Sequence, residues 1–178
     1  FEFRNWYQNA EGSFHGLLGE ALNPEKTAVL DLSAGSFLSA KTDGVSLEKQ
    51  QNILDEYLRE NNVEIGVGKY TEARSFYAAK EFLNNSIDGQ EKRTIHLGID
   101  VFAPSGASIF APIDGVVHQL QDNQSPLDYG PTVILKHQPE NGPEFFTLYG
   151  HLGRECLQQL QIGQVIKGGM PLAKIGNS

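Results

Sequence analysis

The segment "HLGIDVFAPSGASIFAPIDGVV" at residues 96–117 has the pattern of short strands joined by tight turns. Its β-branched and aromatic residues come in short runs. Proline and glycine interrupt these runs at APSG (103–106) and again at APIDG (111–115). Many short strands separated by such turns are typical of sandwiches and small barrels. This stretch therefore predicts a mainly β fold.

The same pattern continues to the end of the chain. Further strand-like runs are GVVHQL, PTVILKH, FFTLYGHL, QVIKGG and PLAKIG, and only RECLQQL (154–160) reads as one or two helical turns. We predict that residues 91–178 form one compact domain, an antiparallel β sandwich or barrel-like structure.

Residues 1–90 have a mixed pattern and predict an N-terminal α/β extension. TAVLDLS (27–33) favours a short strand, and SLEKQQNILDEYLREN (46–61) favours a helix that Ser46 caps. TEARSFYAAKEFLNN (71–85) is interpreted as a second helix, in which Glu72 and Arg74 would pair at the surface and contribute little.

Composition narrows the function classes. The 178 residues carry a net charge of -8, which argues against a nucleic-acid partner because phosphates would be repelled. Cys156 is the single cysteine, so no internal disulfide forms. No apolar run reaches about eighteen residues, and no membrane span is predicted. The chain begins with Phe1 rather than methionine, so we expect a piece of a longer protein.

His96 and Asp100 are the first candidate site. In a straight strand, residues four apart share a face but lie roughly 13 Å from each other, which makes binding of one ion by both marginal. Gly98 allows a bend that would bring the two side chains together. A metal pair requires donor atoms within about 5 Å of each other. The alternative is an edge-strand histidine and a turn aspartate without a ligand.

The other histidines give weaker signals. His151 lies at the end of the strand-like FFTLY run, where a histidine is more often a hydrogen-bonded surface residue than a catalyst. His118 and His137 lie inside strand-like runs without an acidic partner at an informative spacing, and we interpret both as structural or exposed.

Taken together, HLGIDVFAPSGASIFAPIDGVV, TVILKH, TLYGHL and IGQVIKGGMPLAKIG resemble the lysostaphin-type zinc metalloendopeptidases, which cleave the peptide cross-bridges of peptidoglycan. The resemblance covers residues 91–178 and implies a compact, mostly antiparallel β fold with its site in a groove. It implies that His96 and Asp100 are zinc ligands and that His151 is a catalytic histidine that does not bind the metal. The implied cofactor is zinc, and the implied substrate is a peptide or peptidoglycan-like molecule.

The sequence departs from the family pattern in one respect. The H-x-H motif, which carries the third zinc ligand and another catalytic histidine, does not occur within residues 1–178. A catalytic zinc site uses three protein ligands and one open position. We therefore expect this 178-residue piece to bind zinc weakly and to lack peptidase activity.

Shorter blocks extend the resemblance. VLDLSAGS, GVGKYTEAR and RTIHLGIDVFAP are similar to a peptidase-like domain in bacterial fusion proteins, where it lies between an aminoglycoside-phosphotransferase-like kinase domain and a class III aminotransferase domain. This implies a cytoplasmic protein, other domains of a larger chain as partners, and a domain that could be a catalytically silent binding or scaffold module. Without that resemblance, a periplasmic or secreted location is expected.

A carrier domain is a third interpretation of the sequence. IFAPIDGVV and IGQVIKGGMPLAKIG are also similar to biotinyl and lipoyl carriers. Such carriers display a lysine beside methionine at a hairpin tip, whereas Lys167 and Lys174 lie in the final strand-like runs. This reading also leaves the two histidine-containing motifs without a role.

Overall fold

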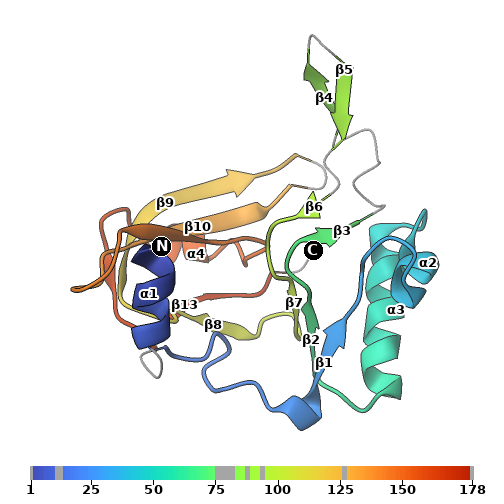
Figure 1. The fold of residues 1–178 in the computed structure, drawn as a ribbon, viewed down its shortest axis with the longest axis horizontal. Coiled ribbons are helices and arrows are strands. Elements are labelled where there is room, and N and C mark those ends of the chain that lie inside the picture. The colour runs from blue at the N-terminus through green and yellow to red at the C-terminus, as the bar shows by residue number, and fades with distance from the viewer. Residues whose placement is uncertain are drawn as a thin grey trace. The chain divides into compact units, whose positions relative to one another are not determined.

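The described part of the chain is mainly β, as predicted (Figure 1). The computed structural model describes residues 2–10, 14–74, 83–86, 89–92, 95–125 and 128–176. Among these residues, no helix has both the length and the apolar character that crossing a membrane requires.

The chain divides into two compact units. Unit 1 comprises Phe1–Leu22 and Pro104–Ser178, and unit 2 comprises Asn23–Ala103. These units differ from the expected division into residues 1–90 and 91–178, because the HLGID segment belongs to unit 2. The expected division stays a prediction about how the chain behaves in solution.

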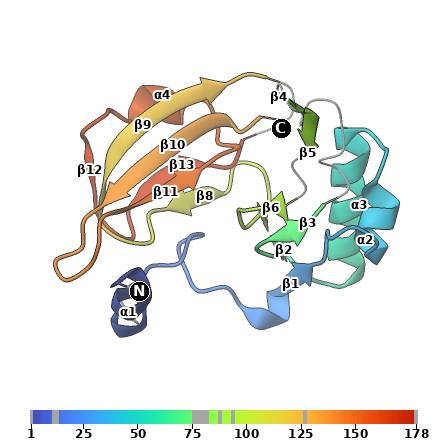
Figure 2. The ribbon, with the colours of Figure 1, turned by 45° about the horizontal axis from the view of Figure 1, so that its top comes forward.

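Unit 1 contains two antiparallel sheets and two helices. Its elements are α1 (Glu2–Asn9), β8 (Ser108–Phe110), β9 (Gly115–Asn123), β10 (Gly130–His137), β11 (Phe145–Tyr149), α4 (Cys156–Gln159), β12 (Val165–Ile166) and β13 (Pro171–Lys174). The larger sheet has the order β11-β10-β9-β12, and β13 pairs with β8 in the smaller one. Figure 2 shows the long strands β9 and β10 side by side. The predicted helical turn at 154–160 is confirmed as α4.

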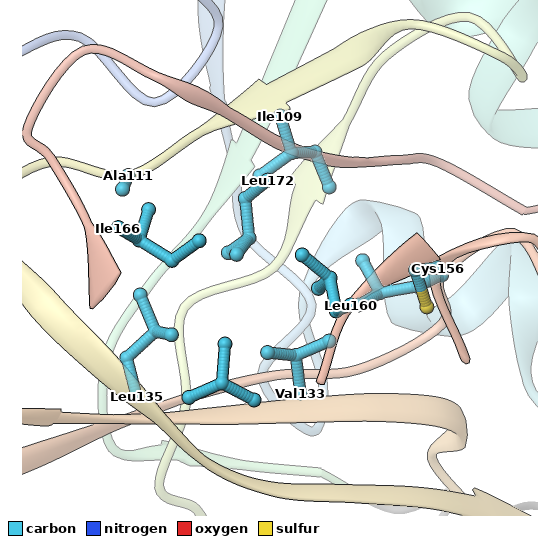
Figure 3. Packing of buried hydrophobic residues seen from close by; sticks show 10 residues of the cluster. Ile109, Ala111, Val133, Leu135, Cys156, Leu160, Ile166 and Leu172 are labelled. Carbon is cyan, nitrogen blue, oxygen red and sulfur yellow. The ribbon is translucent and has the colours of Figure 1, made fainter. Parts of the chain in front are cut away.

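The core of unit 1 lies between these two sheets. In β10, alternate side chains point inward, and Val133 and Leu135 are fully buried. This is the two-residue period of a strand with one covered face. Figure 3 shows Ile109 and Leu172, from the smaller sheet, facing these two residues across the core. Unit 1 thus has the packing of a small β sandwich.

Unit 2 combines helices with short strands. Its elements are a 3-10 helix (Pro24–Lys26), β1 (Thr27–Leu30), α2 (Phe37–Thr42), α3 (Leu47–Glu60), β2 (Ile65–Gly68), β3 (Glu72–Ala73), β4 (Leu83–Ser86), β5 (Gly89–Lys92), β6 (Ile95–His96) and β7 (Val101–Phe102). β1 and β2 pair in parallel, β2 pairs antiparallel with β7, β3 pairs with β6, and β4 pairs with β5. The core of this unit consists of Leu30, Leu38, Leu54 and Leu58.

Two of the three elements that local sequence predicted for unit 2 are confirmed. The helix predicted over 46–61 is confirmed as α3, and the Ser46 hydroxyl accepts a hydrogen bond from the backbone N–H of Lys49. The strand predicted over 27–33 is confirmed as β1. The helix predicted over 71–85 is wrong at both ends, because β3 and β4 are strands. Its middle, residues 75–82, lies outside the described residues.

Candidate functional site

His96 and Asp100 lie close together because the chain bends between them. β6 ends at His96, a bend follows at Gly98, and β7 begins just after Asp100. His96 Nε2 is 3.7 Å from Asp100 Oδ1. This distance lies within the limit of about 5 Å expected for two ligands of one ion. A straight strand would not allow such an approach.

Gly98 makes room for the imidazole. A Cβ atom at this position would lie 3.1 Å from His96 Nε2 and 3.3 Å from its Cε1. Both distances are tighter than ordinary van der Waals contact, so the ring would have to move if residue 98 carried a side chain. The glycine between the two candidate ligands therefore permits close packing as well as the bend.

The second oxygen of Asp100 is bound by an arginine. Arg74 Nη1 lies 2.6 Å from Asp100 Oδ2. The backbone carbonyl of Asp100 accepts a hydrogen bond of 2.9 Å from the N–H of Gly68 at the end of β2. The main chain of Asp100 is thus fixed to β2, and its carboxylate is fixed by Arg74, which follows β3.

Arg74 also binds a buried glutamate. Its Nε and Nη2 donate to Glu72 Oε2 over 3.0 Å and 2.7 Å. Glu72 Oε1 accepts a hydrogen bond of 2.9 Å from the backbone N–H of Leu32. The Glu72 side chain is 2% exposed and that of Arg74 is 12% exposed. The expected pairing of these two residues is therefore confirmed, but its expected location at the surface is wrong. Glu72 lies inside unit 2 because it belongs to β3, which pairs with β6, and Arg74 follows directly after this strand.

The charges around Asp100 favour a cation. Two carboxylates and one guanidinium give the group of Glu72, Arg74 and Asp100 a formal charge of −1. Burial by itself would lower the pKa of the Arg74 guanidinium, but the charge of Asp100 and the hydrogen bond to Glu72 outweigh it and raise the pKa. Arg74 therefore stays protonated, and these three side chains together carry a net charge of −1.

The donor atoms of His96 and Asp100 fit a zinc ion. Bonds of about 2 Å at tetrahedral angles place two ligand atoms roughly 3.3 Å apart. The observed 3.7 Å is close to that separation, and imidazole nitrogen and carboxylate oxygen are both ordinary zinc ligands. Within the described ranges, no group of three or more His, Cys, Asp or Glu side chains could hold a metal ion. The described residues thus supply two candidate ligands.

His151 occupies a strained and well-anchored position in unit 1. It follows β11 and has a φ of 56°, which is uncommon for a residue with a side chain. Its N–H donates to the Tyr129 carbonyl over 2.6 Å, and its own carbonyl accepts from Gly176 over 2.9 Å. Its side chain is exposed, with the Tyr129 ring 6.3 Å away between centroids. Strained, exposed residues of this kind occur often at functional sites.

The predicted convergence of His151 with the other two residues stays a prediction. His96 and Asp100 belong to unit 2 and His151 belongs to unit 1. The remaining histidines of the large sheet are structural or exposed, as expected. His137 is fully buried and contacts the Asp114 carbonyl and the Thr147 hydroxyl, whereas His118 is exposed and lies against Phe146.

Three comparisons with known proteins place the candidate residues in context. Neither the comparison with curated proteins nor the comparison with solved structures finds a similar protein. The family comparison does, and its match contains all three candidate residues of the site. Residues 94–178 match the model of peptidase family M23, in agreement with their resemblance to the lysostaphin-type enzymes.

Proposed function

We propose that the chain carries a zinc-dependent peptide hydrolase site that acts on peptidoglycan-like cross-bridge peptides. His96 and Asp100 would be metal ligands and His151 a catalytic residue. The observation that carries the proposal is the approach of His96 Nε2 to Asp100 Oδ1 inside a segment that matches a peptidase family. The family match supports a peptidase, whereas zinc and the substrate class are part of the proposal.

The roles of the residues follow from their chemistry. Bound zinc supplies a Lewis acid for the peptide carbonyl and lowers the pKa of water. Asp100 contributes negative charge through Oδ1, and His96 offers Nε2 as a neutral imidazole. His151, with an exposed imidazole on a fixed backbone, would donate a hydrogen bond to the reacting groups or exchange a proton with them.

Zinc affinity, measured by competition with a chelator, tests the ligand assignment. We expect weak binding, because two protein ligands leave the other positions to water. His96→Ala should abolish it, while His151→Ala and the matched exposed control His118→Ala should retain it. Zinc binding that survives His96→Ala would place the metal elsewhere.

Hydrolysis of cross-linked glycopeptides should be assayed with the chain and with any longer protein that contains it. His151→Ala should reduce the rate of hydrolysis without reducing metal affinity.

A second candidate function is a silent binding or scaffold module. It is favoured by the Arg74 guanidinium, which already engages Asp100, and by the presence of two ligands among the described residues. Its partners would be the other domains of a kinase and aminotransferase fusion protein in the cytoplasm. A working hydrolase would instead be periplasmic or secreted, close to peptidoglycan. Absence of any His96-dependent zinc binding would favour the silent module.

A further inference from the structure

A continuous series of contacts runs from the backbone of Leu32 to the imidazole of His96. Leu32 N–H binds Glu72, Glu72 binds Arg74, Arg74 binds Asp100, and Asp100 faces His96. The first three contacts are between 2.6 and 2.9 Å. Two of these residues are candidate ligands, whereas the proposed hydrolase mechanism assigns no role to Glu72 and Arg74.

The guanidinium connects two carboxylates at once. Nη1 is directed at Asp100, while Nε and Nη2 are directed at Glu72. This use of a planar group with fixed donor directions sets the orientation of Asp100 relative to Glu72. A lysine at position 74 would keep the charge but could not present donors in this rigid arrangement.

Glu72 anchors the arginine to the interior of unit 2. Its side chain is nearly inaccessible and binds a backbone N–H, so its position is set by the fold. Glu72 is also the register partner of His96 in the β3–β6 pair. The β3–β6 pair therefore places His96 directly, and it places Asp100 through Arg74, which follows β3.

Glu72 also compensates the positive charge of Arg74. An arginine beside Asp100 would by itself repel a cation at Oδ1. The Glu72 carboxylate compensates that charge and leaves the negative charge of Asp100 available. An arginine and a glutamate together can thus orient a ligand without cancelling its attraction for a metal.

We propose that Arg74 and Glu72 are positioning residues that hold Asp100 by Oδ2, so that Oδ1 alone is presented beside His96 to a divalent cation. The inference rests on the proposed function, because it assigns a purpose to the arrangement around the same two ligands. Groups behind metal ligands typically change metal affinity by about 10–100-fold when they are altered.

The test uses Co²⁺ as the probe, titrated into the chain and followed by paramagnetic shifts of backbone amide signals from residues 95–101. Shifts of this kind report weak binding as well as tight binding. Arg74→Lys should lower the Co²⁺ affinity at least about tenfold. The matched control is Arg59→Lys, because Arg59 is 77% exposed and pairs only distantly, at 4.0 Å, with Glu56. This control should bind Co²⁺ like the unaltered chain.

Gly68→Ala is a second variant, useful if Arg74→Lys fails to fold. A Cβ there would lie 3.2 Å from Arg74 Nη2 and 3.4 Å from Asp100 Cβ, so it disturbs the pair without changing any charge. Its Co²⁺ affinity should also fall. Circular dichroism must show that each variant used in the comparison is folded.

A double-mutant cycle separates positioning from a general structural effect. If Arg74 acts through Asp100, Arg74→Lys should cause no further loss in an Asp100→Asn background. Equal losses in both backgrounds, or an unchanged affinity of folded Arg74→Lys, would overturn the positioning role while leaving the metal site intact. Co²⁺ binding that ignores His96→Ala would overturn the metal site and the positioning role together.

Discussion

Replacement of Glu72 by glutamine should strongly destabilise unit 2. The carboxylate accepts two hydrogen bonds from Arg74 and one from the N–H of Leu32, with its side chain 2% exposed. A glutamine has one acceptor oxygen, so its NH₂ group would face either the guanidinium or the backbone N–H, both of which are donors. One donor would lose its partner in a nearly water-free position.

The loss in the free energy of unfolding can be estimated from these contacts. Breaking a buried ion pair costs about 3–5 kcal/mol, and hydrogen bonds to charged groups contribute about 1.5–3 kcal/mol. Because Arg74 retains Asp100 in the variant, we expect Glu72→Gln to lower the free energy of unfolding by about 2–4 kcal/mol. A unit of this size is stabilised by roughly 4–12 kcal/mol, so this loss is a large and measurable fraction of its stability.

The control is Glu64→Gln, which breaks an exposed pair in the same unit. Glu64 lies 3.1 Å from Lys26, and the two side chains are 68% and 45% exposed, so the loss should stay below about 1 kcal/mol. Urea unfolding followed by circular dichroism gives the free energies. Hydrogen exchange of the Leu32 amide, which should accelerate only in Glu72→Gln, reports the broken hydrogen bond. Equal losses in the two variants, within about 0.5 kcal/mol, would refute the buried-pair reasoning.

Three further predictions concern the same unit. Gly98→Ala should weaken zinc binding, because its Cβ would lie 3.1 Å from His96 Nε2; unchanged affinity in a chelator titration would contradict this packing. Gly66→Ala should lower the free energy of urea unfolding by about 1–3 kcal/mol, because its Cβ would lie 2.5 Å from Leu30 Cδ1 in the core. The hydrogen bonds from Lys69 and Ser33 lower the pKa of Asp31 from 3.8 to about 2. The contribution of Asp31 to the free energy of unfolding is therefore complete above pH 3.8 and disappears as the pH falls through 2. Asp31→Asn should therefore flatten the loss of stability between pH 4 and pH 2, and equal slopes in acid titrations of the two proteins would refute this role.

The sequence by itself determined the types of most elements. Strand-like runs with proline and glycine between them predicted a mainly β chain, and a serine before an apolar stripe predicted α3. These features depend on backbone preferences within a few residues, which is why a single sequence contains them. The spacing of His96 and Asp100 around Gly98 made them a candidate pair, and the resemblance to the lysostaphin-type enzymes implied that they are zinc ligands.

Tertiary structure decided the environment of that pair. The segment around Glu72 and Arg74 was predicted to be a helix, but Glu72 and Ala73 form β3, which pairs with β6. The side chains of Glu72 and Arg74 are only 2% and 12% exposed. Glu72 meets Leu32 forty positions earlier in the chain, and Arg74 meets Asp100 twenty-six positions later. Contacts of this kind depend on which strands pair and in which register, and burial across the whole unit selects that register. No local pattern carries this information, so the sequence shows the candidate ligands, whereas the fold shows what holds Asp100 in place.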